Sequence, residues 1–548
     1  MTETLHVLVV GAGPTGLALA TELRRHGLTC RIIDRAVDRP ANQARALTMW
    51  DGALDVLDRH GTGDAVRARG LPMTAARYFS GGRPVAQVRF GPETGNDAEP
   101  LIITQPSVES VLVENLRALG VPVEWRTELL ELTDRGEHVD VLLRRGDEVE
   151  RLTPQWVVGC DGAHSAVRTL SGITFEGSTY PQSYTLGDGV ITAPVPPGEA
   201  HYHLHPDGVL VVVPLPDGQV RVFADASGIG GDPDAAPTVD DLQRLVDTRA
   251  PYPIKIHELQ WATRFLVHMR HSAAFRSGRC VLAGDAAHVH SPAGGQGLNT
   301  GIQDAANLGG KLAAIISGGA DAEVLLAGYE SERMPIAREV IQAADRQTKL
   351  WTVRSRPGRA LRDLVLGTLS RGGLLEKRLV PSLAQYELDY RHSPAVGKRG
   401  GRRALGRAIP EAVLVGPDGA AIGLRRLLSA PGHVLVAVLD ATPSADDAGR
   451  VSMLRARIKE SGLPFRLHVI VPGDPSATTV PDLGEVFYAP PGFAPKHELA
   501  GCKLIAIRPD GYVADASPTL DLDELLGKLP GFRAPHGVVP TPLGRKVS

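Results

Sequence analysis

The first part of the chain alternates apolar runs with glycine turns in an order that predicts a β-strand, an α-helix and a second strand. Residues 5–10 form a continuous apolar run typical of a buried strand, and apolar side chains recur at helical spacing over residues 15–26. Gly27 ends the predicted helix, and a second apolar strand begins at Cys30. A βαβ unit of this kind implies a parallel sheet.

The pattern of apolar positions changes twice further along the chain. Residues 76–100 are strand-like, residues 101–120 return to a helix, and residues 121–160 indicate a β-meander. Between about 180 and 272, alternating strands predict an antiparallel sheet that includes one helix near 239–249; the strands are expected at 201–205, 209–213 and 219–224. Helical spacing resumes from 298 to about 390.

The last part of the chain predicts a small α/β domain of its own. Residues 393–405 are basic and glycine-rich, which is typical of a linker, so the further domain is expected at 406–548. Its predicted strands are 433–439, 466–471 and 503–507, and its predicted helices are 446–461 and 519–529.

Length and charge narrow the class of protein. A chain of 548 residues is too long for one hydrophobic core and suggests roughly two to four domains. A formal net charge of −3 shows no basic excess, so nucleic acid is not an expected partner. Met1–Thr4 lack the basic segment of a signal peptide, and no apolar run approaches the ~20 residues of a membrane span. We expect a cytoplasmic protein that does not associate with membranes.

A glycine motif lies between the first predicted strand and helix. Gly11, Ala12, Gly13, Pro14, Thr15 and Gly16 fit GxGxxG, and Asp34 ends the next strand. The glycines let the backbone approach a pyrophosphate at the positive end of the helix, and Asp34 is placed to accept hydrogen bonds from ribose hydroxyls. The alternative is a glycine-rich turn in any α/β protein, but the strand–turn–helix context favours a Rossmann-like dinucleotide-binding domain.

A second motif, from Asp161-Gly162 through Ser165 to Arg168, follows a predicted buried strand. Taken alone, this string is equally consistent with an ordinary strand-to-helix turn in which Asp161 caps the helix.

A third motif spans residues 279–308. An apolar strand ends in Gly284-Asp285, a loop containing Pro292, Gly295 and Gly297 follows, and a helix begins near Leu298 and Asn299. Asp285 can accept hydrogen bonds from sugar-like hydroxyls, and the helix N-terminus presents free N–H groups to negative charge.

Metal binding is not expected. His288 and His290 lie in the third motif, but no third ligand is evident nearby. Cys30, Cys160, Cys280 and Cys502 are far apart, so neither a CxxC pair nor a zinc cluster is available.

The three motifs, in this order and spacing, resemble those of the FAD-dependent aromatic hydroxylases, the single-component flavoprotein monooxygenases that include para-hydroxybenzoate hydroxylase and phenol hydroxylase. The resemblance covers about residues 1–390. It implies an FAD-binding domain formed by residues 1–75, 101–180 and 273–392, and a substrate-binding lobe formed by residues 76–100 and 181–272. The lobe offers possible pocket walls at Tyr202, Val211, Val213, Phe223, Trp261 and Phe265.

The resemblance also implies roles for individual residues. Asp34 and Arg35 would bind the adenosine end of FAD, and Arg45 and Gln105 would lie along the pyrophosphate and ribityl chain. Asp161 would support flavin and nicotinamide nucleotide binding, Gly284 and Asp285 would hold the ribityl chain and pyrophosphate, and the backbone around the isoalloxazine would come from Pro292, Gly295, Gly297, Leu298 and Asn299. No general base is assigned, because Asp51 offers no certain match to the catalytic Asp of phenol hydroxylase and is more simply a solvent-facing helix residue.

The end of the chain carries a further resemblance. Residues 503–514 resemble the thioredoxin-like tail of phenol hydroxylase and of bacterial aromatic polyketide hydroxylases. A working thioredoxin needs two close cysteines, and only Cys502 is present in the tail, so we expect a redox-inactive, structural domain.

The implied function is oxygenation of an aromatic polyketide or phenol. NAD(P)H, bound transiently, would reduce FAD, and a C4a-hydroperoxyflavin formed with O2 would hydroxylate the ring. Baeyer–Villiger oxygenation of a ketone on the same scaffold and, less favoured, a non-catalytic flavin-binding protein remain as alternatives. The oligomeric state is expected to be a monomer or a homodimer.

Overall fold

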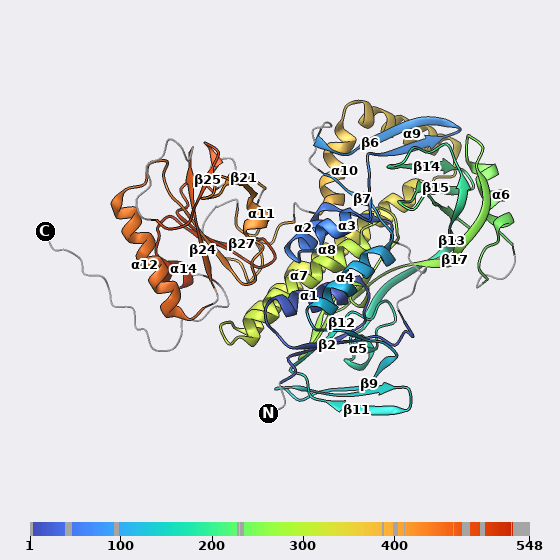
Figure 1. Ribbon diagram of the computed structural model, residues 1–548. Coiled ribbons are helices and arrows are strands. Elements are labelled where there is room, and N and C mark those ends of the chain that lie inside the picture. The colour runs from blue at the N-terminus through green and yellow to red at the C-terminus, as the bar shows by residue number, and fades with distance from the viewer. Residues whose placement is uncertain are drawn as a thin grey trace. The chain divides into compact units, whose positions relative to one another are not determined.

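The computed structural model describes residues 4–38, 46–92, 98–226, 229–230, 235–385, 388–397, 404–409, 411–463, 465–473, 483–493, 499–527 and 529. The chain forms two compact units, Met1–Ala306 with Arg333–Glu387 and Asn307–Glu332 with Leu388–Ser548 (Figure 1). Among the described residues, no helix is long and apolar enough to cross a membrane.

A six-stranded sheet at the N-terminus of the first unit contains the predicted βαβ element. Strand β1 (Val7–Val10), helix α1 (Pro14–Arg25) and strand β2 (Cys30–Ile33) follow one another, and β1 and β2 are parallel. All four residues of β1 are buried, as its continuous apolar run requires of a strand inside a parallel sheet. The sheet is completed by β12 (Trp156–Gly159), β19 (Cys280–Leu282), β8 (Val123–Glu124) and β18 (Arg276–Ser277).

The meander predicted for residues 121–160 is present over Thr127–Leu152, while β8 and β12 at the two ends of that stretch belong to the parallel sheet instead. Strands β9 (Thr127–Asp134), β10 (Val139–Arg145) and β11 (Glu148–Leu152) pair antiparallel, and helix α5 (Ala166–Leu170) follows β12. Helix α4 (Gln105–Ala118) covers most of the stretch 101–120 predicted to be helical, but the beginning of that stretch forms a short strand, β7 (Leu101–Ile102), instead. A small three-stranded sheet contains β3 (Thr48–Met49), β4 (Leu71–Pro72) and β7.

An eight-stranded sheet forms the rest of the β structure of this unit. Its order is β20-β17-β13-β16-β15-β14-β5-β6. The strands are β5 (Ala75–Ser80), β6 (Arg83–Arg89), β13 (Phe175–Thr192), β14 (Glu199–His205), β15 (Gly208–Pro214), β16 (Val220–Asp225), β17 (Lys255–Ser272) and β20 (His288–Val289).

Two features of this sheet correct the sequence-based expectation. The lobe was expected to be antiparallel, but β14 pairs with β5 in parallel, because β5 enters the sheet from a distant part of the chain rather than through a hairpin. Strands β13 and β17 are 18 residues long each, and no strand of that length was predicted.

Helices surround the two sheets. They are α2 (Asp51–Arg59), α3 (Gly63–Arg67), α6 (Val239–Arg249), α9 (Arg356–Arg371) and α10 (Leu374–Ala384). Helices α7 (Gly297–Ile316) and α8 (Ala322–Trp351) each contribute residues to both units. The predicted helical stretch from 298 to about 390 is therefore confirmed as a series of four helices.

The second unit is built on a seven-stranded sheet of order β22-β21-β25-β24-β23-β26-β27. Strand β23 is parallel to β24 and antiparallel to β26, and β26 is antiparallel to β27. A capping box of Ser444 and Asp447 begins α12, the helix between β23 and β24. The elements are β21 (Val413–Val415), β22 (Ala421–Gly423), α11 (Leu424–Leu427), β23 (Val434–Val438), α12 (Ala445–Ser461), β24 (Arg466–Pro472), β25 (Val486–Ala489), β26 (Leu504–Ile507), β27 (Val513–Ser517) and α14 (Leu522–Leu526).

Candidate functional site

The glycine loop after β1 needs each glycine for a different reason. A Cβ at Gly11, whose φ is +103°, would lie 2.4 Å from the carbonyl oxygen of Cys160, and a Cβ at Gly16 would lie 1.9 Å from the Gly11 oxygen. A Cβ at Gly13 would meet no atom within 4 Å, so this glycine borders open space. Pro14 begins α1, whose N-terminus carries the positive end of the helix dipole beside that space. The loop can therefore receive a pyrophosphate.

Asp34 lies next to this loop at the end of β2. One carboxylate oxygen accepts the Ala12 N–H at 2.8 Å and the other accepts the Ala36 N–H at 2.8 Å. Since each carboxylate oxygen has two lone pairs, Asp34 both holds the loop and retains capacity for ribose hydroxyls. Arg35 beside it is exposed, and Arg45 lies outside the described residues.

Gln105 begins helix α4, and its side-chain amide donates to the Glu109 carboxylate at 2.8 Å.

Asp51 begins helix α2 and is half-buried, contrary to the solvent-facing position expected for it. Its carboxylate accepts the Glu99 N–H at 2.9 Å, and burial raises its pKa.

Ser165 is the N-cap residue of helix α5, and Asp161 accepts from the cap and from the first N–H groups of the helix. The strand-to-helix turn that the sequence left open is therefore present, with Ser165 as the cap in place of Asp161. The Asp161 carboxylate accepts from the Ser165 hydroxyl at 2.5 Å and from the Ala166 N–H at 2.6 Å, and burial raises its pKa. Arg168 then connects two of the motifs, because its guanidinium donates to the carbonyls of Ala163 at 2.7 Å and Ala286 at 2.8 Å. The sequence indicated Arg168 as part of a string but gave no signal for this link.

The Gly-Asp motif and the start of α7 converge on the first helix. A Cβ at Gly284 would lie 2.5 Å from the Thr15 hydroxyl oxygen, and a Cβ at Gly301 would lie 2.2 Å from the same atom. The three backbone segments can approach one another only because both positions are glycine. Asp285 is exposed at this junction.

Asp304 binds Gly284 at the same junction and two further side chains, a role that sequence reasoning missed. Its carboxylate accepts from the Gly284 N–H at 3.0 Å, from His288 Nε2 at 2.7 Å and from Arg333 Nε at 2.6 Å. His288 is therefore a partner of Asp304.

His290 donates through Nδ1 to the Ser291 carbonyl at 2.7 Å, and burial lowers its pKa to about 4. Within the described ranges, no group of three His, Cys, Asp or Glu side chains could hold a metal ion.

The loop between Pro292 and Gly297 is held by side chains from two other segments. Asn299 donates to the carbonyls of Gly295 at 2.7 Å and Thr48 at 2.8 Å, and it accepts the Trp50 N–H at 2.7 Å. The indole N–H of Trp50 donates to the Gly294 carbonyl at 2.9 Å. Gly294 and Gly295 have φ values of +83° and +61°. Helix α7 begins at Gly297, so its first N–H groups have no partner within the helix.

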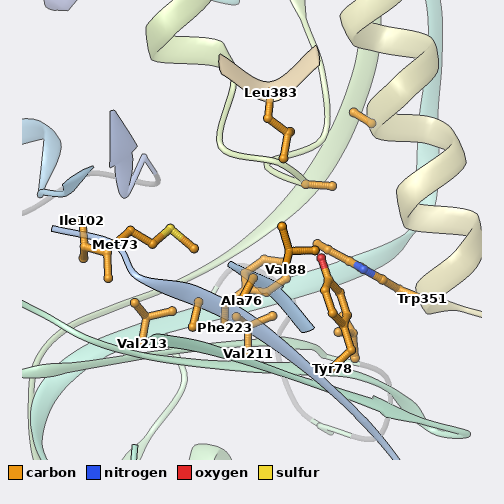
Figure 2. Packing of buried hydrophobic residues seen from close by; sticks show 14 of the residues in the cluster. Met73, Ala76, Tyr78, Val88, Ile102, Val211, Val213, Phe223, Trp351 and Leu383 are labelled. Atoms are coloured by element: carbon orange, nitrogen blue, oxygen red, sulfur yellow. The ribbon is translucent and has the colours of Figure 1, made fainter. Parts of the chain in front are cut away.

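A cavity opens directly beside this loop. It contains about 910 Å³ of space not filled by atoms, a volume that includes open solvent at its mouth. Pro292, Gly294 and Gly295 form one wall, and strands of the eight-stranded sheet form another. Figure 2 shows Val211, Val213 and Phe223 on the sheet side, Leu383 on the opposite side, and Tyr78 and Trp351 at one end.

Most of the expected wall residues belong to this cavity. Tyr202, Val211, Val213 and Phe223 line it, while Phe265 and Trp261 pack in the surrounding hydrophobic cluster. Sequence reasoning missed Trp50, Tyr78, Trp351 and Arg221, which also line the cavity, because they come from segments that have no local signal for a shared site.

Aromatic rings and one ion pair give the cavity its chemistry. The rings of Tyr78 and Tyr202 stack with centroids 4.9 Å apart, and the Trp351 centroid lies 5.6 Å from that of Tyr202. Burial raises the pKa of Tyr202 to about 12, so its hydroxyl stays protonated at neutral pH. Arg221 is buried, and its guanidinium holds the Asp188 carboxylate through two hydrogen bonds of 2.7 and 2.6 Å.

Comparison with known proteins agrees with this geometry. A family model described as an FAD binding domain matches residues 4–344. The chain is 34% identical over 532 residues to 6-methylpretetramide 4-monooxygenase of Streptomyces rimosus, covering 93% of this chain and 90% of that protein. The chain belongs to the FAD-dependent aromatic hydroxylases.

Solved structures of aromatic hydroxylases share the fold. CabE, an aromatic hydroxylase from angucycline biosynthesis, is 29% identical with a TM-score of 0.75, and the match covers 97% of this chain and 100% of that chain. OxyS anhydrotetracycline hydroxylase from Streptomyces rimosus is 27% identical, with the same TM-score and the same coverage. This hydroxylase is therefore a flavin-dependent monooxygenase with FAD as its cofactor.

The residues present fit FAD. The open space at Gly13 suits the pyrophosphate, the carboxylates of Asp34 and Asp285 suit ribose and ribityl hydroxyls, and the free N–H groups of α7 suit the electronegative edge of the isoalloxazine. All three features lie in the first unit.

Asp285→Ala should weaken FAD binding. Removing a carboxylate that accepts from hydroxyls costs ~1.5–3 kcal/mol, or roughly ten- to a hundredfold in the dissociation constant. Fluorescence titration of the apoprotein with FAD measures this constant. Asp207→Ala removes a similarly exposed carboxylate from the β14–β15 turn and should leave FAD binding unchanged. Equal affinities for wild type and Asp285→Ala would contradict the role of the Gly-Asp motif.

Proposed function

We propose that this monooxygenase takes electrons from transiently bound NAD(P)H and uses O2 to hydroxylate an aromatic polyketide or a related phenol. The observation that carries this proposal is the cavity with aromatic and aliphatic walls, which is lined on one side by Pro292, Gly294 and Gly295. A flat molecule of several rings suits such walls. The relatives' names support the same class of substrate, since they specify 6-methylpretetramide and anhydrotetracycline.

FAD, when bound, accepts a hydride from NAD(P)H and activates O2 for transfer to an electron-rich ring. We assign the pyrophosphate to the Gly11–Gly16 loop, the adenosine end to Asp34 and Arg35, and the chain between them and the isoalloxazine to Arg45, Gln105 and Asp285. Asp161 supports the nucleotide sites by holding Ser165 and the first N–H group of α5.

The flavin ring is assigned to the backbone from Pro292 and Gly295 to Asn299. The N-terminus of α7 at Gly297 and Leu298 would stabilise negative charge on a flavin held there, because the first N–H groups of the helix have no partner within it and its dipole is positive at this end.

The cavity residues position the substrate and exclude water. The stack of Tyr78, Tyr202 and Trp351 offers a flat surface for aromatic rings. Arg221, paired with Asp188, is the charged group among the cavity residues, and it orients a phenolic or carbonyl oxygen without adding net charge. The apolar side chains that make up most of the walls keep water from the reacting atoms.

The second unit is proposed to be a thioredoxin-like domain without redox function. Strand β23, helix α12 and strand β24 followed by the β26–β27 hairpin and α14 agree with a thioredoxin-like arrangement. Cys502 is buried, as are the other three cysteines. The hydroxylase is further proposed to be cytoplasmic and to act as a monomer or homodimer.

Steady-state kinetics with candidate substrates tests this proposal. We expect NADPH or NADH oxidation to be slow alone and at least about tenfold faster with a phenolic polyketide, with one O2 consumed per product and little H2O2. Anhydrotetracycline is the first probe. Oxidation that no aromatic compound accelerates, with all the O2 released as H2O2, would contradict hydroxylation. A ring-expanded lactone as product would instead indicate Baeyer–Villiger oxygenation.

A further inference from the structure

Trp50 lines the cavity described above and also holds the loop between Pro292 and Gly297, which we call the flavin loop because the isoalloxazine is assigned to it. Its indole ring lines the cavity and packs edge-on against Phe90, with ring centroids 5.7 Å apart at 67°. Its indole N–H donates to the Gly294 carbonyl at 2.9 Å, and its backbone N–H donates to the Asn299 side chain at 2.7 Å. The residue is 3% exposed.

The segment that Trp50 holds contains two adjacent glycines, which have wide backbone freedom. Gly294 and Gly295 both have positive φ values, and glycine can leave that region at little cost. Asn299 donates to the Gly295 carbonyl, so Gly294 and Gly295 are held by the Trp50 indole and the Asn299 amide respectively. A shift of the indole therefore acts directly on the carbonyl of Gly294.

A second tryptophan shows that lining the cavity does not require such a link. Trp351 also lines the cavity and is 3% exposed. Its indole nitrogen is buried and has no hydrogen-bond partner among the residues that the structure describes. Trp351 thus lines the cavity as Trp50 does, but it lacks the connection of Trp50 to the 292–297 loop.

We propose that Trp50 is a positioning residue that couples occupation of the cavity by an aromatic substrate to the conformation of the 292–297 loop, and thereby to reduction of FAD. The inference rests on the proposed function. An aromatic substrate contacts the Trp50 ring and favours one position of it. Because the indole N–H is bonded to Gly294, the loop conformation that matches this position gains population when substrate binds.

The test compares Trp50→Phe with Trp351→Phe as holoenzymes. Each substitution keeps an aromatic ring in the cavity wall and removes an indole N–H, but only the Trp50 N–H bonds the flavin loop among the described contacts. Anaerobic stopped-flow measures FAD reduction by NADPH with and without anhydrotetracycline. Titration of the oxidised enzyme with the same probe gives its dissociation constant and the change in the flavin visible spectrum.

We expect Trp50→Phe to bind the probe within about threefold of wild type but to lose roughly tenfold of the probe-stimulated reduction rate, since one hydrogen bond of ~1.4 kcal/mol corresponds to a factor of ten. The probe-induced change in the flavin spectrum should shrink in parallel. Without probe, Trp50→Phe should also release FAD more readily than Trp351→Phe. Trp351→Phe should bind the probe more weakly, because its ring is part of the cavity wall. At saturating probe it should nevertheless keep the stimulated reduction rate and the full change in the flavin spectrum.

The outcomes separate the coupling from the proposed function. Full stimulation and an unaltered spectral change in Trp50→Phe, while wild type is stimulated, overturn the coupling alone. Equal losses in both variants also overturn it, because they would reflect the cavity wall and not the link to Gly294. A wild type that shows neither stimulation nor a spectral change with aromatic probes overturns the proposed function and the coupling together.

Discussion

Asp304→Ala should lower the free energy of unfolding by about 3–5 kcal/mol, because it leaves a buried charge without its partner. Asp304 and Arg333 are both 0% exposed, and the Asp304 carboxylate accepts from Arg333 Nε at 2.6 Å. The same carboxylate holds the Gly284 N–H at 3.0 Å and His288 Nε2 at 2.7 Å. The variant should therefore also lose most of its FAD, since Gly284 precedes Asp285.

Chemical denaturation of the apoprotein and the FAD content of the purified protein measure these two effects. The double variant Asp304→Leu/Arg333→Met is the control, and it should recover part of the stability because it leaves no unpaired charge. A loss below 1 kcal/mol with full FAD content, relative to the about 3–5 kcal/mol expected, would contradict the assignment.

The same carboxylate gives an expected pH dependence. Burial acts to raise the pKa of Asp304, but the charges of Arg333 and His288 outweigh burial and lower it. A group whose pKa is lower in the folded state stabilises the fold above its unfolded pKa of about 3.9, and this stabilisation is lost as the pH falls through the folded value.

Glu332→Ala should be as damaging to the second unit, at about 3–5 kcal/mol, because several buried donors share one carboxylate. Glu332 accepts from Arg508 at 2.7 and 2.8 Å, from Lys311 at 2.8 Å, from Asn307 at 2.6 Å and from Ser393 at 2.6 Å. Burial opposes ionisation, but Arg508 and Lys311 hold the pKa of Glu332 well below its usual value. Burial lowers the pKa of Lys311 to about 8, so without Glu332 that lysine would lose a charge that favours its protonated form.

Urea denaturation measures this loss of stability. Glu460→Ala, which removes the exposed partner of Arg457 in the same unit, is the control and should change the free energy of unfolding by less than about 1 kcal/mol. If Glu332→Ala unfolds at the same urea concentration as the control, the buried network does not stabilise this unit.

Local signals account for what could be predicted of the fold. The β1–α1–β2 unit was predicted because its apolar runs, its glycines and Asp34 are adjacent in sequence. Strand β13 was missed because Gly177, Pro181, Gly187 and Gly189 interrupt its apolar pattern, and its stability comes instead from pairing with β17 along its length. Strand β27 was not predicted, and only its first two residues, Val513 and Ala514, lie in the stretch 503–514 that was recognised by resemblance.

The candidate site was likewise predicted only where the sequence carries a local signal. Motif residues at the ends of strands, such as Asp161 and Asp285, could be named from the sequence because strand ends of a parallel sheet meet at one edge. The links that hold these motifs together could not, because Trp50 and Gly294 are 244 residues apart and Arg168 and Ala286 are 118 residues apart. Such pairs become neighbours only through tertiary packing.

Mass spectrometry of the product formed under 18O2 tests the central claim most directly. The holoenzyme, NADPH and a panel of aromatic polyketides that begins with anhydrotetracycline would be incubated in 18O2, with H2 16O as solvent. If the enzyme is an aromatic hydroxylase, we expect a hydroxylated product that carries one 18O atom and forms only when FAD, NADPH and O2 are all present. A product oxygen derived from water, or NADPH oxidation that yields only H2 18O2 with every aromatic compound, would contradict it.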